Sequence, residues 1–524
     1  MKKSHTRSIS RVHAGRFAIT LACASSTAAC SGYYPLGSVS QEEQPLEGGE
    51  PGPGTQAGDA RVGALLATAE VTIGSPEVYT ATLVAAGDMD GDGHGDMAYT
   101  SDDPATGVYF VHIRYGGPRP LGEEAAFAFD RSGAFLTMQE FLPLYVFAAG
   151  DVDGDGRSDL IVKTVECDVT RSGEGTYLVY GGERMTGAAA LSSAGTYFAP
   201  PTRAGDHLNE AACEGPSYAA GPGDMDGDGI DDFVIEHDPG SLPDGSSLFG
   251  VGEGVYVFYG RAERFSGDLE YSDADASFHI ADQVESSAVG DVNGDGLADL
   301  LVTPVEHDWP PSQPGSYMLG GRAQRYGGAL DLVESTRLIA EATPGWMNGP
   351  GDLDGDGIDD LVLEDADRIQ HLFYGSPAAF EAGFDFAQAD AVFPQSELSQ
   401  AYLVGDRDAD GDDELLDFFG VPNGTSTPPT DVAFLSGSGE RLSGDVLFPE
   451  SEVIAQTPNG RFPEDPFRLL DAAIPAGDLD GDGAADLFTV SKQVIRDGNG
   501  GLLIEGFELH IHYGTPADFV RAPR

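Results

Sequence analysis

The chain has 524 residues, of which 87 are acidic and 28 are basic, and its formal net charge at pH 7 is -59. This balance excludes a protein that binds nucleic acid through a lysine- and arginine-rich surface, and it argues against docking on anionic lipid head groups. Hydrophobic residues make up 40% of the chain, which is enough for a packed core. The 72 glycines lack the every-third-residue period of collagen and therefore predict many tight turns.

Residues 1–29 have the pattern of an export signal. A basic stretch over residues 2–16 precedes an apolar run at residues 17–29, which is too short to span a bilayer as a helix. The end of this run, Thr27-Ala28-Ala29-Cys30, resembles the lipobox of bacterial lipoproteins, in which the cysteine becomes the lipidated N-terminus. In that family the following Ser31 implies the outer membrane, so we expect a lipid anchor there, facing the periplasm or the exterior. Ordinary signal-peptidase cleavage, which would give a secreted protein, is the alternative.

Residues 30–59 are interpreted as the lipidated N-terminus and a linker. Gly, Pro, Glu and Gln dominate this stretch, and it has no sustained apolar period. Such a composition is typical of a flexible tether. We therefore expect the membrane to be contacted only through the lipid.

An acidic segment recurs seven times, with Asp at alternate positions and Gly between. The seven segments are called loops 1 to 7 below, and they occupy residues 88–96, 151–159, 224–232, 291–299, 352–360, 406–414 and 478–486. Their starts lie 54 to 73 residues apart. Recurrence at this interval indicates a repeat architecture.

Each repeat has the same internal order. A short apolar stretch such as residues 145–149 leads into the acidic loop, and a strand-like run such as DLIV from Asp159 follows it. An aromatic-rich alternating run then ends in a glycine turn, as in GVYVFYG from Gly254. A weaker fourth strand is expected around residues 269–271. Four strands in each of seven repeats predict an all-β fold, a seven-bladed β-propeller with four-stranded blades over residues 60–524.

The repeat resembles the FG-GAP family, as found in the propeller of integrin α chains and in bacterial VCBS-type surface proteins. The resemblance rests on GDxDGDGxxDLLV followed by GxVYVFYG and covers roughly residues 76–524. It implies seven blades with a calcium loop in each. Integrin heterodimer pairing is not carried over, and we expect a monomer.

The loops carry the residues that Ca²⁺ prefers. Side-chain oxygens occur at positions one, three, five and nine, and position seven can offer its backbone carbonyl. The predicted ligands, loop by loop, are Asp88, Asp90, Asp92, His94 and Asp96; Asp151, Asp153, Asp155, Arg157 and Asp159; Asp224, Asp226, Asp228, Ile230 and Asp232; Asp291, Asn293, Asp295, Leu297 and Asp299; Asp352, Asp354, Asp356, Ile358 and Asp360; Asp406, Asp408, Asp410, Asp412 and Glu414; and Asp478, Asp480, Asp482, Ala484 and Asp486.

We expect about six or seven structural Ca²⁺ ions. Four grouped carboxylates repel one another unless a cation is present. An EF-hand would need Glu at position twelve, where loop 1 has Tyr99, so the loops are not EF-hands. An Asp-Gly turn without metal is the alternative. Loop 6 departs from the pattern, because Ala409 replaces a glycine and Glu414 replaces the last Asp.

A partner is expected on the face opposite the acidic loops, where the connections vary in length. Glu236-His237-Asp238 and Glu306-His307-Asp308 occupy matching places in adjacent repeats and form either a second metal or polar-ligand site or solvated strand ends. Trp309 and Trp346 fall near the same face, either exposed for a sugar or protein or buried under a loop.

Cys167 and Cys213 are predicted to form a disulfide on this variable face. Chain direction brings their connections together in adjacent blades, and an exported protein meets an oxidising compartment. Two separate thiols are the alternative.

No nucleophile elbow, zinc motif or phosphate loop occurs in the chain. The sequence therefore favours a non-catalytic, calcium-stabilised surface scaffold for binding or adhesion, with an unknown protein or glycan as its partner. A polysaccharide lyase-like enzyme or a lectin that uses the variable face is the alternative. Finally, the apolar run at residues 65–73 is predicted to complete the last blade as its outer strand.

Overall fold

The computed structural model describes residues 18–25, 28–35, 71–75, 82–103, 108–118, 134–137, 144–164, 175–185, 188–200, 219–237, 254–267, 269–279, 284–304, 315–335, 337–340, 347–348, 351–365, 369–378, 384–393, 400–419, 431–435, 441–446, 453–456, 467–496 and 502–514. These residues are almost entirely strands and turns, which confirms the all-β prediction. The helices among them are short: α3 (Leu191–Ala194), α4 (Leu332–Ser335), two 3-10 turns (Tyr271–Asp273 and Phe386–Gln388) and a helical piece at residues 377–378. Within these ranges no helix has the length and apolar character needed to cross a membrane.

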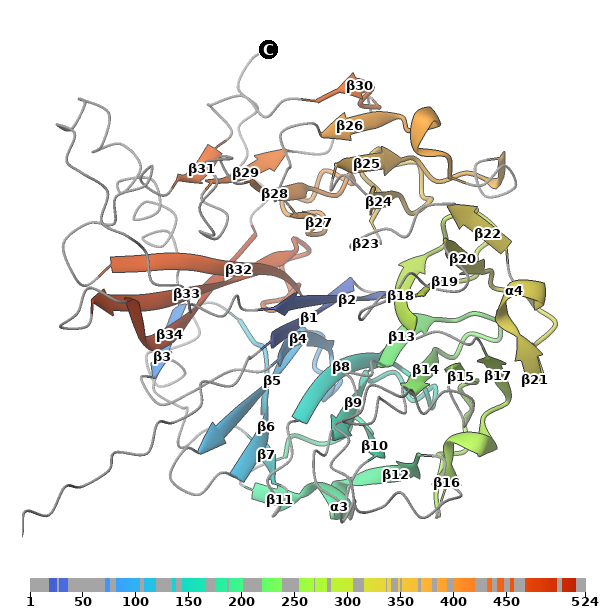
Figure 1. Cartoon of the computed structure of the whole chain (residues 1–524). Helices are drawn as coiled ribbons and strands as arrows, with labels where there is room; N and C mark the ends of the chain where they lie inside the picture. The colour runs from blue at the N-terminus through green and yellow to red at the C-terminus, as the bar shows by residue number, and fades with distance from the viewer. Residues whose placement is uncertain are drawn as a thin grey trace, which may run out of the picture.

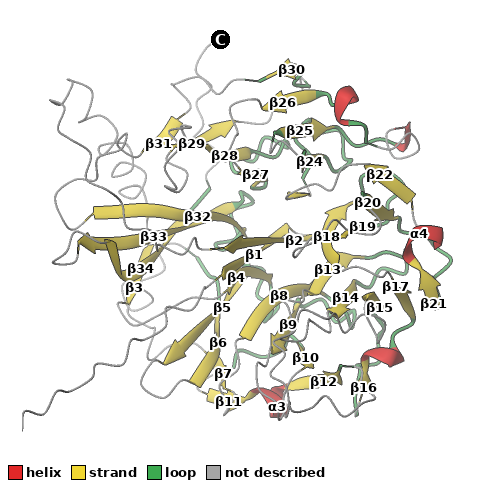
Figure 2. Cartoon of the chain, viewed as in Figure 1, coloured by secondary structure: helices red, strands yellow, loops and turns green. Residues whose placement is uncertain are grey.

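The described strands form seven open sheets, numbered here in the order of the acidic loops they carry. Each sheet contains four neighbouring strands that pair antiparallel, and the inner strand of the sheet leads into the acidic loop. Figure 2 shows these sheets as strands joined by loops, with helix only in small pieces.

The four strands of each of the first four sheets, from the centre outward, are as follows. Sheet 1 has β4 (Thr82–Gly87), β5 (Asp96–Asp103), β6 (Val108–Arg114) and β7 (Ala134–Thr137). Sheet 2 has β8 (Leu144–Gly150), β9 (Asp159–Thr164), β10 (Gly175–Val179) and β12 (Gly195–Ala199). Sheet 3 has β13 (Ala219–Gly223), β14 (Asp232–His237), β15 (Gly254–Phe258) and β17 (Ala276–His279). Sheet 4 has β18 (Val284–Gly290), β19 (Asp299–Pro304), β20 (Ser316–Leu319) and β22 (Arg337–Ala340).

The last three sheets follow the same order. Sheet 5 has β23 (Met347–Asn348), β24 (Leu361–Glu364), β25 (Gln370–Phe373) and β26 (Ala391–Phe393). Sheet 6 has β27 (Gln400–Leu403), β28 (Leu415–Phe419), β29 (Asp431–Leu435) and β31 (Val453–Gln456). Sheet 7 has β32 (Phe467–Gly477), β33 (Asp486–Arg496), β34 (Leu502–His512) and β3 (Val71–Ser75).

The sheets follow one another around a common centre, as Figure 1 shows. Inner strand β4 lies beside β8, β8 beside β13, and β13 beside β18, while β32 of the last sheet lies beside β4 of the first. This arrangement fits a β-propeller-like fold.

The two ends of the repeat region meet in sheet 7. Strand β3 pairs antiparallel with β34, and Ile73 lies opposite Leu509. This pairing confirms that the run before the first acidic loop supplies the outer strand of the last sheet. The described strand covers residues 71–75, so residues 65–70 of the predicted run lie outside the described part of the chain.

Four short strands cross from one sheet to the one before it. Each follows the third strand of its own repeat and pairs in parallel with the fourth strand of the preceding sheet. These crossing strands are β11 (Ala188–Ala190) on β7, β16 (Leu269–Glu270) on β12, β21 (Gly328–Asp331) on β17 and β30 (Gly444–Asp445) on β26.

The crossing strands correct one prediction. Residues 269–271 were expected to be the fourth strand of their own repeat, but Leu269 pairs with Phe198 of sheet 2 instead. The fourth strand of sheet 3 is β17, which pairs with β15. Apolar spacing alone does not distinguish the two partners, because both strands are only two to four residues long.

The core lies between neighbouring sheets. Strands β9, β14 and β19 are buried along their whole length, as expected for strands covered on both faces. Phe198 of sheet 2 meets two rings of sheet 3, with ring centroids 5.7 Å from Phe233 and 5.0 Å from Phe258. Such contacts hold each sheet against the next and fix the position of the loops between their inner strands.

Two strands lie inward of sheet 1. β1 (Ala18–Ser25) pairs in parallel with β4, and β2 (Ala28–Pro35) pairs antiparallel with β1 and lies beside β18. These strands overlap the predicted export signal, and cleavage within this segment stays a prediction. The predicted disulfide between Cys167 and Cys213 lies outside the described residues, as do Asp238, residues 306–308, Trp309 and Trp346.

Candidate metal sites in the acidic loops

Loop 1 is folded around the carboxylate of its first aspartate. Asp88 Oδ1 accepts hydrogen bonds from the backbone N–H of Gly91 at 2.7 Å and of Asp92 at 3.1 Å, and Asp88 Oδ2 accepts from Gly93 at 2.7 Å. The turn requires positive φ at Gly91 (77°) and Gly93 (88°), which glycine adopts without strain. The N–H contacts from positions five and six recur at position one of the other six loops.

The acid at position nine ties the loop to its sheet. Asp96 is fully buried, and its two oxygens accept from the backbone N–H of Met89 at 2.8 Å and of Gly116 at 2.7 Å. Gly116 follows the third strand, so this carboxylate connects the loop, the second strand and the third strand. The same pair of bonds is made by Asp159, Asp232, Asp360 and Asp486.

Burial makes these position-nine carboxylates hard to ionise. Desolvation by burial raises the pKa of Asp96 to about 7 and that of Asp159 to about 8, while the backbone hydrogen bonds lower it and neighbouring acids raise it. The pKa of Asp232 is likewise raised to about 8, and that of Asp360 to about 8. A bound cation would favour the ionised form of each group.

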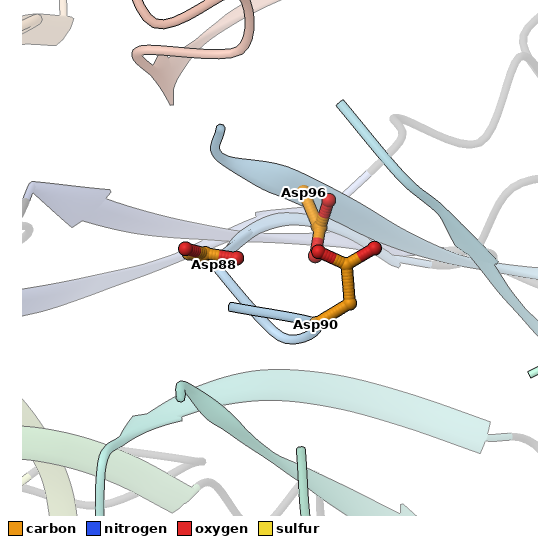
Figure 3. A group of neighbouring side chains, drawn as sticks. All are labelled: Asp88, Asp90 and Asp96. Carbon is orange, nitrogen blue, oxygen red and sulfur yellow. The ribbon is translucent and has the colours of Figure 1, made fainter. Parts of the chain in front are cut away.

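The loop carboxylates converge closely enough to share an ion. Figure 3 shows Asp88, Asp90 and Asp96 with their carboxylates turned toward one another. In loops 1, 2 and 3, oxygens from positions one, three and nine lie within 4.8 Å of one another; in loops 5 and 6 the group comes from positions one, three and five. An all-oxygen donor set of this kind suits a hard divalent cation. The residues present therefore fit a metal ion.

Loop 4 and loop 6 differ from the others. The amide of Asn293 donates to both oxygens of Asp299, at 3.3 and 3.1 Å. In loop 6, Glu414 Oε2 accepts from the backbone N–H of Arg407 at 2.6 Å, and Oε1 has no hydrogen-bond partner among the described residues. Ala409 has φ of 56° and is the only described non-glycine residue with positive φ.

The position-seven residue of each loop lies in the turn before the second strand. In loop 1 the N–H of His94 donates to Asp92 Oδ1 at 3.1 Å. The position-seven side chain also covers the position-four glycine of the preceding loop: a Cβ added at Gly91 would lie 2.9 Å from Arg157 Nε. Metal binding by the position-seven carbonyl oxygens stays a prediction.

The seven loops are joined in a closed ring by backbone hydrogen bonds. In every case the N–H of position eight donates to the carbonyl of position one in the preceding loop, at 2.7 to 3.1 Å. The pairs are Ser158 to Asp88, Asp231 to Asp151, Ala298 to Asp224, Asp359 to Asp291, Asp413 to Asp352, Ala485 to Asp406 and Gly95 to Asp478. The last bond returns from loop 1 to loop 7 and closes the ring.

Four arginines that the sequence analysis did not single out contact the loops. Each comes from the following repeat, just before its crossing strand, and pairs with the carboxylates at positions three and five. We call these the fork arginines; they are Arg184 on Asp90 and Asp92, Arg264 on Asp153 and Asp155, Arg325 on Asp226 and Asp228, and Arg441 on Asp354 and Asp356.

Each fork arginine stacks on a tyrosine of the preceding repeat. Arg325 lies 4.8 Å from the Tyr259 ring centroid, and the Tyr259 hydroxyl accepts from the backbone N–H of Tyr326 at 2.9 Å. Tyr115, Tyr180 and Tyr374 make equivalent contacts. The sequence signal is a Glu or Gln, then Arg, then an apolar residue, after the glycine turn that follows the third strand: ERM, ERF, QRY and ERL.

On the opposite face, Glu236 and His237 are buried rather than solvated. Glu236 Oε1 accepts from the backbone N–H of Ser286 in the next sheet, and the His237 ring lies edge-on to Tyr271 at 5.7 Å. Lys163 is also buried here, with its ammonium 5.9 Å from the Tyr271 ring centroid. These contacts bind sheets 2, 3 and 4 together.

Comparison with protein families matches part of the chain to a known repeat. The FG-GAP repeat model matches residues 284–306, which run from β18 through loop 4 and β19. The chain therefore contains an FG-GAP repeat, consistent with an FG-GAP repeat protein.

Proposed function

We propose that this chain is an exported, non-catalytic binding scaffold, built as a seven-bladed propeller and stabilised by calcium. Each of the seven sheets would be one blade. The observation that carries the proposal is the closed ring of hydrogen bonds between loops whose carboxylates converge. Ions held in those loops would neutralise the repulsion that opposes the ring.

Calcium is the ion that this donor set favours. Carboxylates at positions one, three, five and nine and a carbonyl at position seven would supply a flexible oxygen shell, whereas Mg²⁺ demands a small octahedral one. Loops 1, 2, 3, 5 and 7 have aspartate at all four positions, loop 6 has four carboxylates with Glu414 at position nine, and loop 4 has Asn293 at position three. We therefore propose six or seven ions with a structural role.

The location follows from the N-terminal segment. A positive stretch, a short apolar run and the lipobox-like residues before Cys30 support export and an outer-membrane lipid anchor. The variable connections opposite the acidic loops would then face a protein or glycan partner.

Native mass spectrometry tests the metal part of this proposal. The mature protein in ammonium acetate with Ca²⁺ should carry six or seven ions that chelator removes, and Asp88→Asn should remove one. Absence of any calcium adduct would contradict the proposal. A glycan array with and without EDTA tests the partner: binding of an oligosaccharide supports a glycan scaffold, and turnover of a polymer would contradict the non-catalytic role.

A further inference from the structure

The fork arginines and the asparagine of loop 4 are two ways to limit the negative charge around a candidate metal position. In loop 3, four carboxylates at positions one, three, five and nine share one guanidinium, that of Arg325. In loop 4, position three is Asn293, which leaves three carboxylates. Both arrangements therefore have a formal charge of three negatives around the candidate metal position.

No fork arginine faces loop 4, so a fourth carboxylate there would have no positive partner. The segment that corresponds to the fork region, residues 374–393, contains neither Arg nor Lys. The amide of Asn293 instead donates to Asp299, at 3.1 Å from Oδ2. In loops 1, 2, 3 and 5 the acid at position three faces a fork arginine, whereas loop 4, where the chain offers no basic residue, has Asn293 there. Loops 6 and 7 also have an acid at position three, and the segments that correspond to their fork regions lie largely outside the described residues.

The fork holds the two carboxylates in fixed places. Arg325 Nε pairs with Asp226 Oδ2, and its terminal nitrogen lies 2.7 Å from Asp228 Oδ2. The carboxylate of Asp226 is almost fully buried, with 3% of the side chain exposed, whereas 43% of the Arg325 side chain is exposed. A buried carboxylate next to three others is costly without a positive partner. The guanidinium geometry also suits two acceptors at once, which an ammonium cannot match.

We infer that the fork arginines act as fixed cations that keep the acidic loops folded when metal is absent. They are positioning residues: they hold positions three and five in place and limit the repulsion in the metal-free loop. This inference rests on the proposed metal role of the loops, but its test is made on metal-free protein. The same arginines come from the following repeat, so they also keep adjacent sheets joined during metal loss.

The test compares loop 3 variants by their melting temperature in excess chelator. Arg325→Gln should lower the melting temperature by roughly 2 °C, because four carboxylates then face no cation. Arg325→Gln combined with Asp226→Asn rebuilds the arrangement of loop 4 and should restore most of the loss. Arg322→Gln is the matched control: Arg322 lies three residues earlier and stacks on Tyr326, without contact to a loop carboxylate. It should change the melting temperature much less.

Loop 4 supplies the reverse experiment. Asn293→Asp adds a fourth acid with no arginine to face it, so it should lower the melting temperature in chelator and gain the largest stabilisation from added calcium. The inference is overturned if the double variant is no more stable than Arg325→Gln, or if Arg322→Gln is equally harmful. Identical melting of the wild-type protein with calcium and chelator would contradict the calcium proposal alone, because the comparisons between variants in chelator would still stand.

Discussion

Ala409 shows how one residue can distort a repeated turn. The corresponding position in the other six loops is glycine with positive φ, whereas Ala409 adopts φ of 56° with a side chain attached. The left-handed region costs a residue with a Cβ about 1–2 kcal/mol. The position-seven residue of the next loop is Ala484, the smallest of the seven, which leaves room for the extra methyl group.

Replacing Ala409 with glycine should therefore stabilise the protein by about 1 kcal/mol. The gain would be measured as an increase in the urea midpoint at constant slope. Gly91→Ala is the matched comparison and should destabilise, since Gly91 has φ of 77° and an added Cβ would lie 2.9 Å from Arg157 Nε. A loss of stability in Ala409→Gly would show that the strain is absent.

The position-nine acids predict an inverted pH dependence in chelator. Burial raises the folded-state pKa of Asp159, Asp232 and Asp360 to about 8, far above the value near 4 expected in the unfolded chain. Between pH 4 and pH 8 the folded state binds more protons than the unfolded state. The contribution of these groups to the free energy of unfolding is therefore complete below pH 4 and is lost as the pH rises through 8. The metal-free protein should thus melt at a higher temperature at pH 5.5 than at pH 8. Calcium should flatten or reverse this trend, because it binds the ionised groups. Melting curves at both pH values, with and without calcium, check the sign.

At the scale of elements, the third strand of one repeat and the crossing strand of the next are joined by a tyrosine. The hydroxyl of Tyr259, which is buried, accepts from the N–H of Tyr326 just before β21. Tyr259→Phe should cost about 1–3 kcal/mol, because it leaves a backbone N–H without its acceptor. Urea unfolding measures the change. Tyr326→Phe, which removes a hydroxyl that bonds Gly320 within the same repeat, is the control for loss of an inter-repeat contact. Equal stability of Tyr259→Phe and wild type would contradict the role given to this bond.

The elements were predictable to different degrees. The second and third strands follow directly from the alternating aromatic and β-branched runs beside each acidic loop, as β9 and β15 illustrate. The crossing strands were not predictable from the sequence, because β16 and β30 are two residues long and their parallel partners lie in another repeat. Among the site residues, the acids can be predicted from their regular spacing in the sequence. The fork arginines could not be predicted in this way, since their partners lie about 90 to 110 residues away in sequence.

At the scale of the whole molecule, closure depends on a strand that precedes all the loops. β3 covers the outer edge of β34, and the Gly95–Asp478 bond joins the first loop to the last. A chain of residues 76–524 lacks β3 and would expose the edge of an eleven-residue strand. It should melt at a lower temperature and associate more readily than a chain of residues 60–524. Light scattering and thermal melting of the two chains provide the comparison, and equal behaviour would contradict closure by β3.

The central proposal is that metal ions neutralise a ring of converging carboxylates. Its most direct test is the melting temperature of the mature protein in calcium and in excess chelator at pH 7.5. Ligands that bind only the folded state raise its stability by mass action, and several sites should add their effects. We predict a large upward shift in calcium, with magnesium at the same concentration giving much less. Equal melting temperatures in calcium and in chelator would contradict the proposal that calcium holds the ring together.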